Sequence, residues 1–200
     1  MIFYHYTTDN GAAQIALSRK IFKGRGTLAD GSKIEPKLGV NLTTSQSCIG
    51  HGLPFGQKLS ADLFNIAPST VWVQRNPDDP TDMKLLDHSK VRLEIEIDIQ
   101  DSKLQSAENY YANNLKLLEN LALTGHAPLL DYLPKLQQEM CRAAFFRGDL
   151  ENMSKSWYYY FDEIPVSKIK SISLASSFNV YKDTMPFSEW LGMFDKEMGT

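Results

Sequence analysis

The chain has 200 residues, of which 42% are hydrophobic, so it can bury one full core and we expect a single domain over residues 1–200. Its formal net charge of -3 gives no global electrostatic signature of nucleic acid as a partner. Cys48 and Cys141 are far apart without CxxC spacing, and no histidine lies in an HExxH motif. The sequence therefore indicates neither a disulfide framework nor a metal site.

Membrane insertion and secretion are not indicated either. No apolar run approaches the roughly 20 residues that a membrane-spanning helix needs. Met1 is followed by strand-like sequence rather than by a basic and then apolar leader. We therefore expect a cytoplasmic protein without a membrane partner, and delivery into another cell stays open as an alternative.

The first predicted element is a short strand at Ile2–Tyr6, which is rich in aromatic residues and carries His5 in its middle. A helix is expected to follow over residues 11–20, because apolar residues recur there at helical spacing. Asp9 or Asn10 is the expected N-cap of this helix.

The next strand is expected at Gly39–Thr44, after a loop over residues 24–37 that is rich in glycine and charge. Ser45 follows the strand, and residues 45–57 are again rich in glycine. The glycines match neither GxGxxG nor GxxxxGK[ST], so a Rossmann or P-loop phosphate site is not predicted.

Two further strands have clear sequence signals. Residues 69–75 contain alternating valines and end at a turn with two prolines, Asn76–Pro80. Val91–Ile99 alternates apolar and charged residues, which is the period-two pattern of a half-buried antiparallel strand. We expect the Glu-x-Glu pair, Glu94 and Glu96, to form the solvated face of this strand.

The second half of the chain begins with helical periodicity and returns to strands. Helices are expected near residues 106–125 and 128–148, so residues 102–151 are predicted to form a helical insertion. The later elements are strands at 156–161 and 170–174 and a closing helix at 186–198. The order of strands, helices and strands favours the α+β class.

Three short motifs together resemble the ADP-ribosyltransferase superfamily, in its histidine-bearing branch of diphtheria toxin and PARP type. The first is Phe3–Thr8, where the strand carries Tyr-His-Tyr-Thr, and the second is Gly39–Ser45, where a glycine-led strand ends in hydroxyl residues. The third is Asp162–Val166, where an acid precedes a strand. The resemblance implies a split mixed or antiparallel β-sheet core that carries the helical insertion.

The resemblance also implies a chemistry, with NAD as substrate. Cleavage of the bond between nicotinamide and ribose builds positive charge on the ribose, and Glu163 is the carboxylate that the resemblance assigns to its stabilisation. His5 is assigned a hydrogen bond to a ribose hydroxyl. The full set of NAD-binding residues implied by the motifs and their surroundings is His5, Tyr6, Thr7, Thr44, Ser45 and Phe55.

The expected function is transfer of ADP-ribose from NAD to a protein or nucleic acid, as in toxin-like or phage-effector-like enzymes. Two enzymatic alternatives remain open, an NAD glycohydrolase and an RNA 2'-phosphotransferase-like enzyme. A catalytically silent nucleotide-binding module of the same fold is the third. For Trp157–Phe161 we expect core packing, with base stacking as the alternative.

Overall fold

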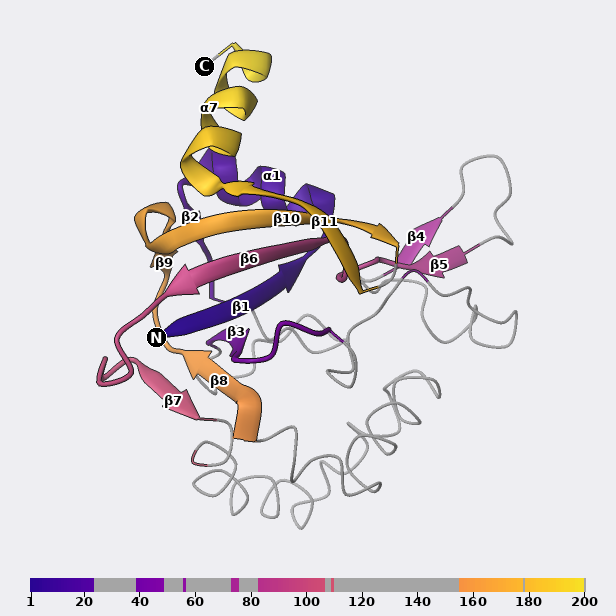
Figure 1. Ribbon diagram of the computed structural model, residues 1–200. Helices are drawn as coiled ribbons and strands as arrows, with labels where there is room; N and C mark the ends of the chain where they lie inside the picture. Colours follow the sequence, from indigo (N-terminus) through magenta and orange to yellow (C-terminus); the bar gives the residue numbers. More distant parts are fainter. Residues whose placement is uncertain are drawn as a thin grey trace, which may run out of the picture.

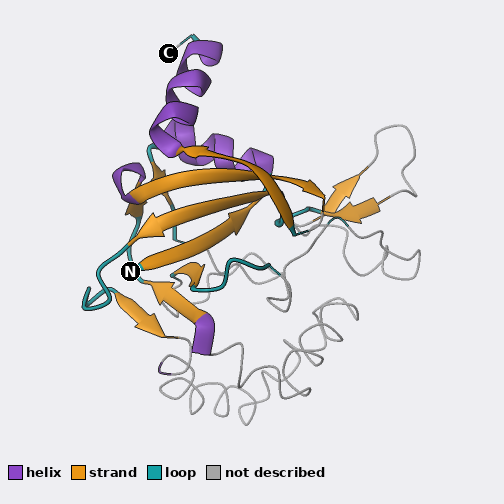
Figure 2. Cartoon of the chain, in the orientation of Figure 1, coloured by secondary structure: helices purple, strands orange, loops and turns teal. Residues whose placement is uncertain are grey.

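The computed structural model describes residues 1–23, 39–48, 56, 73–75, 83–106, 109, 155–177 and 179–199. These residues form a mixed α+β fold around a seven-stranded sheet (Figure 1, Figure 2). Every strand pair among them is antiparallel. The α+β class expected from the order of the elements is therefore confirmed.

The main sheet brings the N-terminal strand to its centre. From one edge to the other its strands are β11 (Val180–Pro186), β10 (Ile169–Ser177), β6 (Val91–Glu96), β1 (Ile2–Thr7), β3 (Val40–Thr43), β8 (Trp157–Tyr160) and β7 (Leu104–Ser106). Two small sheets accompany it: β2 (Lys20–Ile21) pairs with β9 (Ile164–Pro165), and β4 (Val73–Arg75) pairs with β5 (Met83–Leu85). A short 3-10 helix, η2 (Val166–Lys168), joins β9 to β10.

Two helices cover one face of the main sheet, α1 (Asp9–Ser18) and α7 (Phe187–Met198) (Figure 1). Ala12 and Ile15 of α1 and Phe187 of α7 belong to one buried cluster with the apolar residues of the central strands. The two helices are also joined directly, because Arg19 donates to both carboxylate oxygens of Asp195 at 2.8 and 2.9 Å. None of the helices in the described part of the chain is long and apolar enough to cross a membrane.

The alternation predicted for Val91–Ile99 is confirmed for its first six residues. Val91, Leu93 and Ile95 are fully buried in the core, as the pattern requires. The strand ends at Glu96 rather than at Ile99, because the Asp98 carboxylate accepts from the backbone N–H of Gln100 at 3.0 Å and so forms a turn.

The first helix differs from its prediction at both ends. Its N-cap is Thr8, not Asp9 or Asn10: the Thr8 hydroxyl accepts from the Gly11 N–H at 2.9 Å. The threonine caps because β1 runs into the helix with no intervening turn. At the other end Arg19 takes a left-handed conformation with φ 59°, which ends the helix, and β2 begins at the next residue, Lys20.

Several strands were not predicted, and one of them lies within the range expected for the helical insertion. Leu104–Ser106 is the edge strand β7, although we expected residues 102–151 to be the insertion. Apart from residue 109, residues 107–154 lie outside the described part of the chain, so the two expected helices stay predictions. The edge strand β11 was missed because most of its residues are exposed and show no apolar alternation.

The Thr8 cap yields a stability prediction. Thr8→Ala should lower the free energy of unfolding by about 1 kcal/mol, because the Gly11 N–H loses its acceptor. Urea unfolding at constant pH measures the change. Thr8→Ser keeps the hydroxyl and should retain most of the stability, and an equal loss in both variants would contradict the capping role.

Candidate functional site

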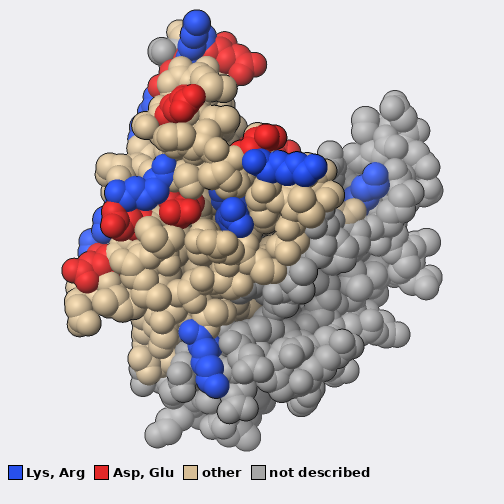
Figure 3. All heavy atoms as spheres, viewed as in Figure 1, with Lys and Arg blue, Asp and Glu red and all other residues tan. Residues whose placement is uncertain are grey.

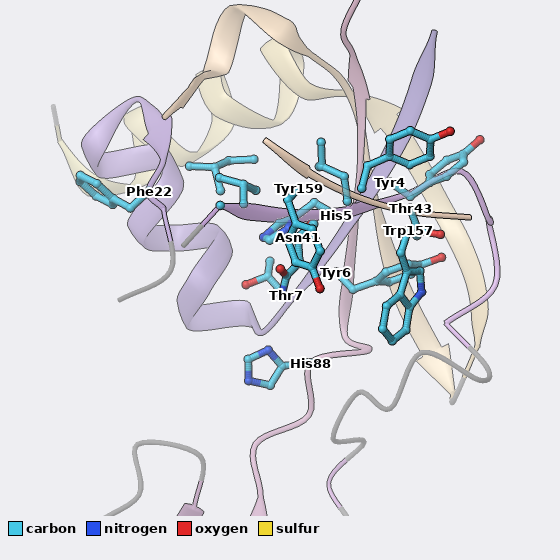
Figure 4. Close-up of a pocket in the computed structure, with 15 residues that line it drawn as sticks. Tyr4, His5, Tyr6, Thr7, Phe22, Asn41, Thr43, His88, Trp157 and Tyr159 are labelled. Carbon is cyan, nitrogen blue, oxygen red and sulfur yellow. The ribbon is translucent and has the colours of Figure 1, made fainter. Parts of the chain in front are cut away.

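A pocket of about 330 Å³ lies beside His5, where β1 and β3 adjoin (Figure 4). This volume is at the lower end of the range of roughly 300 to 1,000 Å³ for small-molecule sites. The described residues that line it come from β1, β2, β3, β8 and three neighbouring segments; they are Tyr4, His5, Tyr6, Thr7, Ile21, Phe22, Gly39, Val40, Asn41, Leu42, Thr43, His88, Trp157, Tyr158 and Tyr159. Three predicted NAD-binding residues, His5, Tyr6 and Thr7, are among them.

The pocket lies where the main sheet is joined most weakly. β1 and β6 share six paired positions, whereas β1 and β3 share one among the described residues, Tyr4 with Thr43. Next to this pair, the His5 ring nitrogen Nδ1 lies 2.9 Å from the backbone oxygen of Asn41. The imidazole thus bridges the two strands where their backbone ladder stops.

This contact fixes the protonation of the His5 ring. The Asn41 carbonyl can only accept a hydrogen bond, so His5 Nδ1 must carry the proton and donate it. Burial lowers the pKa of His5 from its ordinary value of 6.5, and the hydrogen bond to Asn41 opposes this shift less strongly. At neutral pH the ring is therefore uncharged, and its Nε2 is a hydrogen-bond acceptor.

A second imidazole in the pocket, His88, was not among the residues predicted from the sequence. It comes from the segment between β5 and β6, and Figure 4 draws it below Thr7 and Asn41. Burial and the nearby His5 ring lower its pKa, while Asp87 opposes the shift. No motif surrounds His88 in the sequence. Its position follows from the sheet: Val91 pairs with Thr7 of β1, and His88 precedes Val91 by three residues.

Aromatic side chains form much of the remaining wall. Trp157 and Tyr159 alternate with Tyr158 along β8, and Figure 4 shows Trp157 next to Tyr6. Tyr158 also belongs to the pocket lining, and its ring packs on Phe3, edge to face at 5.0 Å between ring centroids. The core packing expected for the aromatic strand is thus confirmed for Tyr158 and for Tyr160, which is buried in the same cluster.

Thr44 and Ser45, two of the predicted NAD-binding residues, are not among the residues that line the pocket. The Thr44 N–H donates to the Ser156 carbonyl at 2.9 Å, which continues the pairing of β3 with β8. The Ser45 hydroxyl donates to the Ser47 carbonyl at 3.2 Å, and the Ser45 carbonyl accepts from the Tyr6 hydroxyl at 3.1 Å. These residues hold the chain that leaves β3 against the sheet.

Glu163, the predicted catalytic carboxylate, follows β8 and is also not among the described residues that line the pocket. Lys20 donates to its Oε2 at 2.8 Å, and both side chains are more than a third exposed. Ile21 pairs with Ile164 in an antiparallel register. If this register is followed by one more residue, Glu163 comes opposite Phe22, which lines the pocket. The carboxylate therefore lies near the pocket and apart from Thr44 and Ser45, which follow the opposite end of β3.

Phe55, the last of the predicted NAD-binding residues, lies outside the described part of the chain. Among the residues that the structure does describe, no group of three or more His, Cys, Asp or Glu side chains could hold a metal ion. On the face drawn in Figure 3, basic and acidic side chains of the described residues intermingle rather than gather by sign. The drawn charges therefore do not favour one class of acceptor.

What the site can do follows from its contents. The described lining combines two imidazoles, aromatic rings, two threonine hydroxyls and an asparagine, and it contains no carboxylate and no lysine or arginine. Such a set suits a planar, hydroxyl-bearing ligand better than a phosphate group. Comparison of the chain with protein-family models, with curated proteins and with solved structures found no match.

The lowered pKa of His5 predicts how stability depends on pH. Below pH 6.5 the unfolded chain takes up a proton at this histidine more readily than the folded protein does, so acid favours unfolding. Wild type should lose stability as the pH falls below 6.5, and His5→Gln should lose less over the same range. Urea unfolding between about pH 5.5 and 7.5 measures both slopes, and equal slopes would contradict the lowered pKa.

Proposed function

We propose that this protein binds NAD in the pocket between β1 and β3 and transfers its ADP-ribose to a macromolecular acceptor. The observation that carries the proposal is the fixed, uncharged His5 ring, whose Nε2 can accept a hydrogen bond inside an aromatic pocket. A ribose hydroxyl is a suitable donor to that nitrogen. The hydrogen bond to Asn41 keeps the ring in the required tautomer before the ligand arrives.

The aromatic wall suits the other part of the ligand, the nicotinamide ring. In NAD this ring is planar and carries a positive charge, and aromatic faces attract such cations. Tyr6 and Trp157 lie side by side in Figure 4 and are the rings we assign to this contact. The pocket volume of about 330 Å³ suits one nucleoside half of NAD, with the remainder of the molecule outside it.

The proposal extends to the fold. An antiparallel sheet with helices on one face, and with its ligand pocket at a weak junction between two central strands, supports a core of ADP-ribosyltransferase type. The first two family-like motifs lie on neighbouring strands, with His5 on β1 and Gly39–Ser45 over β3 and the residues beside it. The third motif is represented by Glu163 after β8.

Transfer requires a carboxylate near the ribose. The bond between nicotinamide and the ribose C1' breaks with its electron pair leaving on nicotinamide, and the acceptor nucleophile forms the new bond to C1' and loses its proton. Positive charge develops on the ribose during this exchange, and a carboxylate stabilises it. Glu163 is the carboxylate that we assign to this role, and Lys20 pairs with it.

The first test concerns binding. NAD should bind to the wild-type protein in calorimetry, and His5→Ala should weaken binding by about tenfold or more, because one buried hydrogen bond and its preorganised acceptor are lost. Glu189→Ala is a suitable control, since Glu189 is exposed on α7 and does not line the pocket. Absence of NAD binding to the wild-type protein at millimolar concentration would defeat the proposed function.

The second test concerns catalysis. Glu163→Gln should lower the rate of nicotinamide release by about a hundredfold or more while NAD binding persists. Lys20→Met removes the same ion pair but leaves the carboxylate, so it should retain release. Undiminished release in Glu163→Gln would show that another carboxylate performs this role, and labelled NAD in cell extract with protease and nuclease controls would identify the acceptor.

A binding module without transfer is the second candidate function. It is favoured by the absence of a carboxylate from the described pocket lining and by the pairing of Glu163 with Lys20. NAD binding without nicotinamide release, in buffer and in cell extract, would support this candidate. Release without a labelled macromolecule would instead indicate a glycohydrolase, and 2'-phosphate removal from RNA would indicate the phosphotransferase alternative.

A further inference from the structure

His88 and His5 face the same pocket although they are 83 residues apart in the sequence. His5 belongs to the central strand β1, and His88 belongs to the segment that leads into β6, the neighbour of β1. Figure 4 draws the His88 ring at the side of the pocket where Thr7 lies. The pocket is therefore lined by the imidazole of His5, on a central strand of the sheet, and by the imidazole of His88, in the segment before β6.

The backbone around His88 is held in place from both sides. Asp87 accepts hydrogen bonds from the Ser89 N–H at 2.9 Å and from the Ser89 hydroxyl at 2.6 Å. The Tyr181 hydroxyl of β11 donates to the Ser89 carbonyl at 2.9 Å, and the Ala175 N–H of β10 donates to the Lys90 carbonyl at 2.8 Å. These contacts fix the backbone of the turn that carries His88.

The charges around His88 keep its ring neutral at physiological pH. Among the described residues, the titratable groups that act on it are His5 from β1 and Asp87 beside it in the chain. Burial and repulsion by His5 lower the pKa of His88, and the attraction of Asp87 is the smaller influence. Burial lowers the pKa of both rings and the His5 ring opposes protonation of His88, so the pocket interior carries no charge from either ring above pH 6.5.

We propose that His88 is a specificity-determining residue that, together with His5, makes the pocket selective for the cationic nicotinamide ring of NAD. While both rings are neutral, they leave the aromatic walls free to attract the cation; once protonated, they repel it. The reduced cofactor NADH has an uncharged dihydronicotinamide ring and lacks this repulsion. The inference rests on the proposed function, since it concerns how that same site chooses its ligand.

The test is the pH dependence of binding for the two cofactors. Calorimetry should show that wild-type affinity for NAD falls by about tenfold or more between about pH 7.5 and 5.5, with a smaller fall for NADH. His88→Gln keeps a polar side chain but cannot take up a proton, so the fall in NAD affinity should shrink to about threefold or less. An unchanged fall in His88→Gln would overturn the role of His88.

The wild-type protein provides a second measurement, which does not depend on how a variant folds. Because binding and protonation are reciprocally linked, saturating NAD should lower the pKa of His88 further, and NADH should lower it less. NMR titration of the histidine rings measures both shifts, and equal shifts would also overturn the inference. Failure of wild type to bind NAD at pH 7.5 would defeat the proposed function itself, whereas binding without these pH effects defeats only the selectivity.

Discussion

The hydrogen bond from His5 to the Asn41 carbonyl is the contact on which the candidate site depends. It joins β1 to β3 next to Tyr4 and Thr43, the one pair that these strands share among the described residues. The side chain thus connects the two strands where backbone hydrogen bonds do not. A side chain in this position can bridge two strands and still present a second polar atom to a cavity. The same bond that supports the sheet therefore also sets the chemistry of the imidazole, since it selects the tautomer with an unprotonated Nε2.

Other side chains of β1 contact the segment that follows β3. Tyr4 and Tyr6 pack around the buried Cys48 and contact the segment that follows β3, where the Tyr4 hydroxyl accepts from the Gln46 side chain at 2.8 Å. Arg92 of β6 donates to the Gln46 carbonyl at 3.0 Å, and its guanidinium lies over the Tyr181 ring at 4.4 Å. Contacts from β1 and β6 thus hold the chain leaving β3 against the sheet.

The sequence predicted those parts of the fold that local patterns determine. The alternation from Val91 and the closing helix both appear in the structure, because each reflects burial against one core. The edge strand β11 escaped prediction because its residues pair with β10 without much burial. Within the site, His5 could be found from its motif, whereas His88 could not, since only the register of β1 against β6 brings it to the pocket.

The position of Glu163 outside the imidazole pocket is consistent with the chemistry proposed for both. A carboxylate placed between His5 and His88 would raise the pKa of each ring and favour the imidazolium, which cannot accept a hydrogen bond at Nε2. Pairing with Lys20 instead compensates the charge of Glu163 close to Phe22, one of the pocket residues. Under the proposed function, the uncharged interior and the charged margin have separate roles: the imidazoles bind the ligand in neutral surroundings, and the carboxylate meets the ribose from outside them.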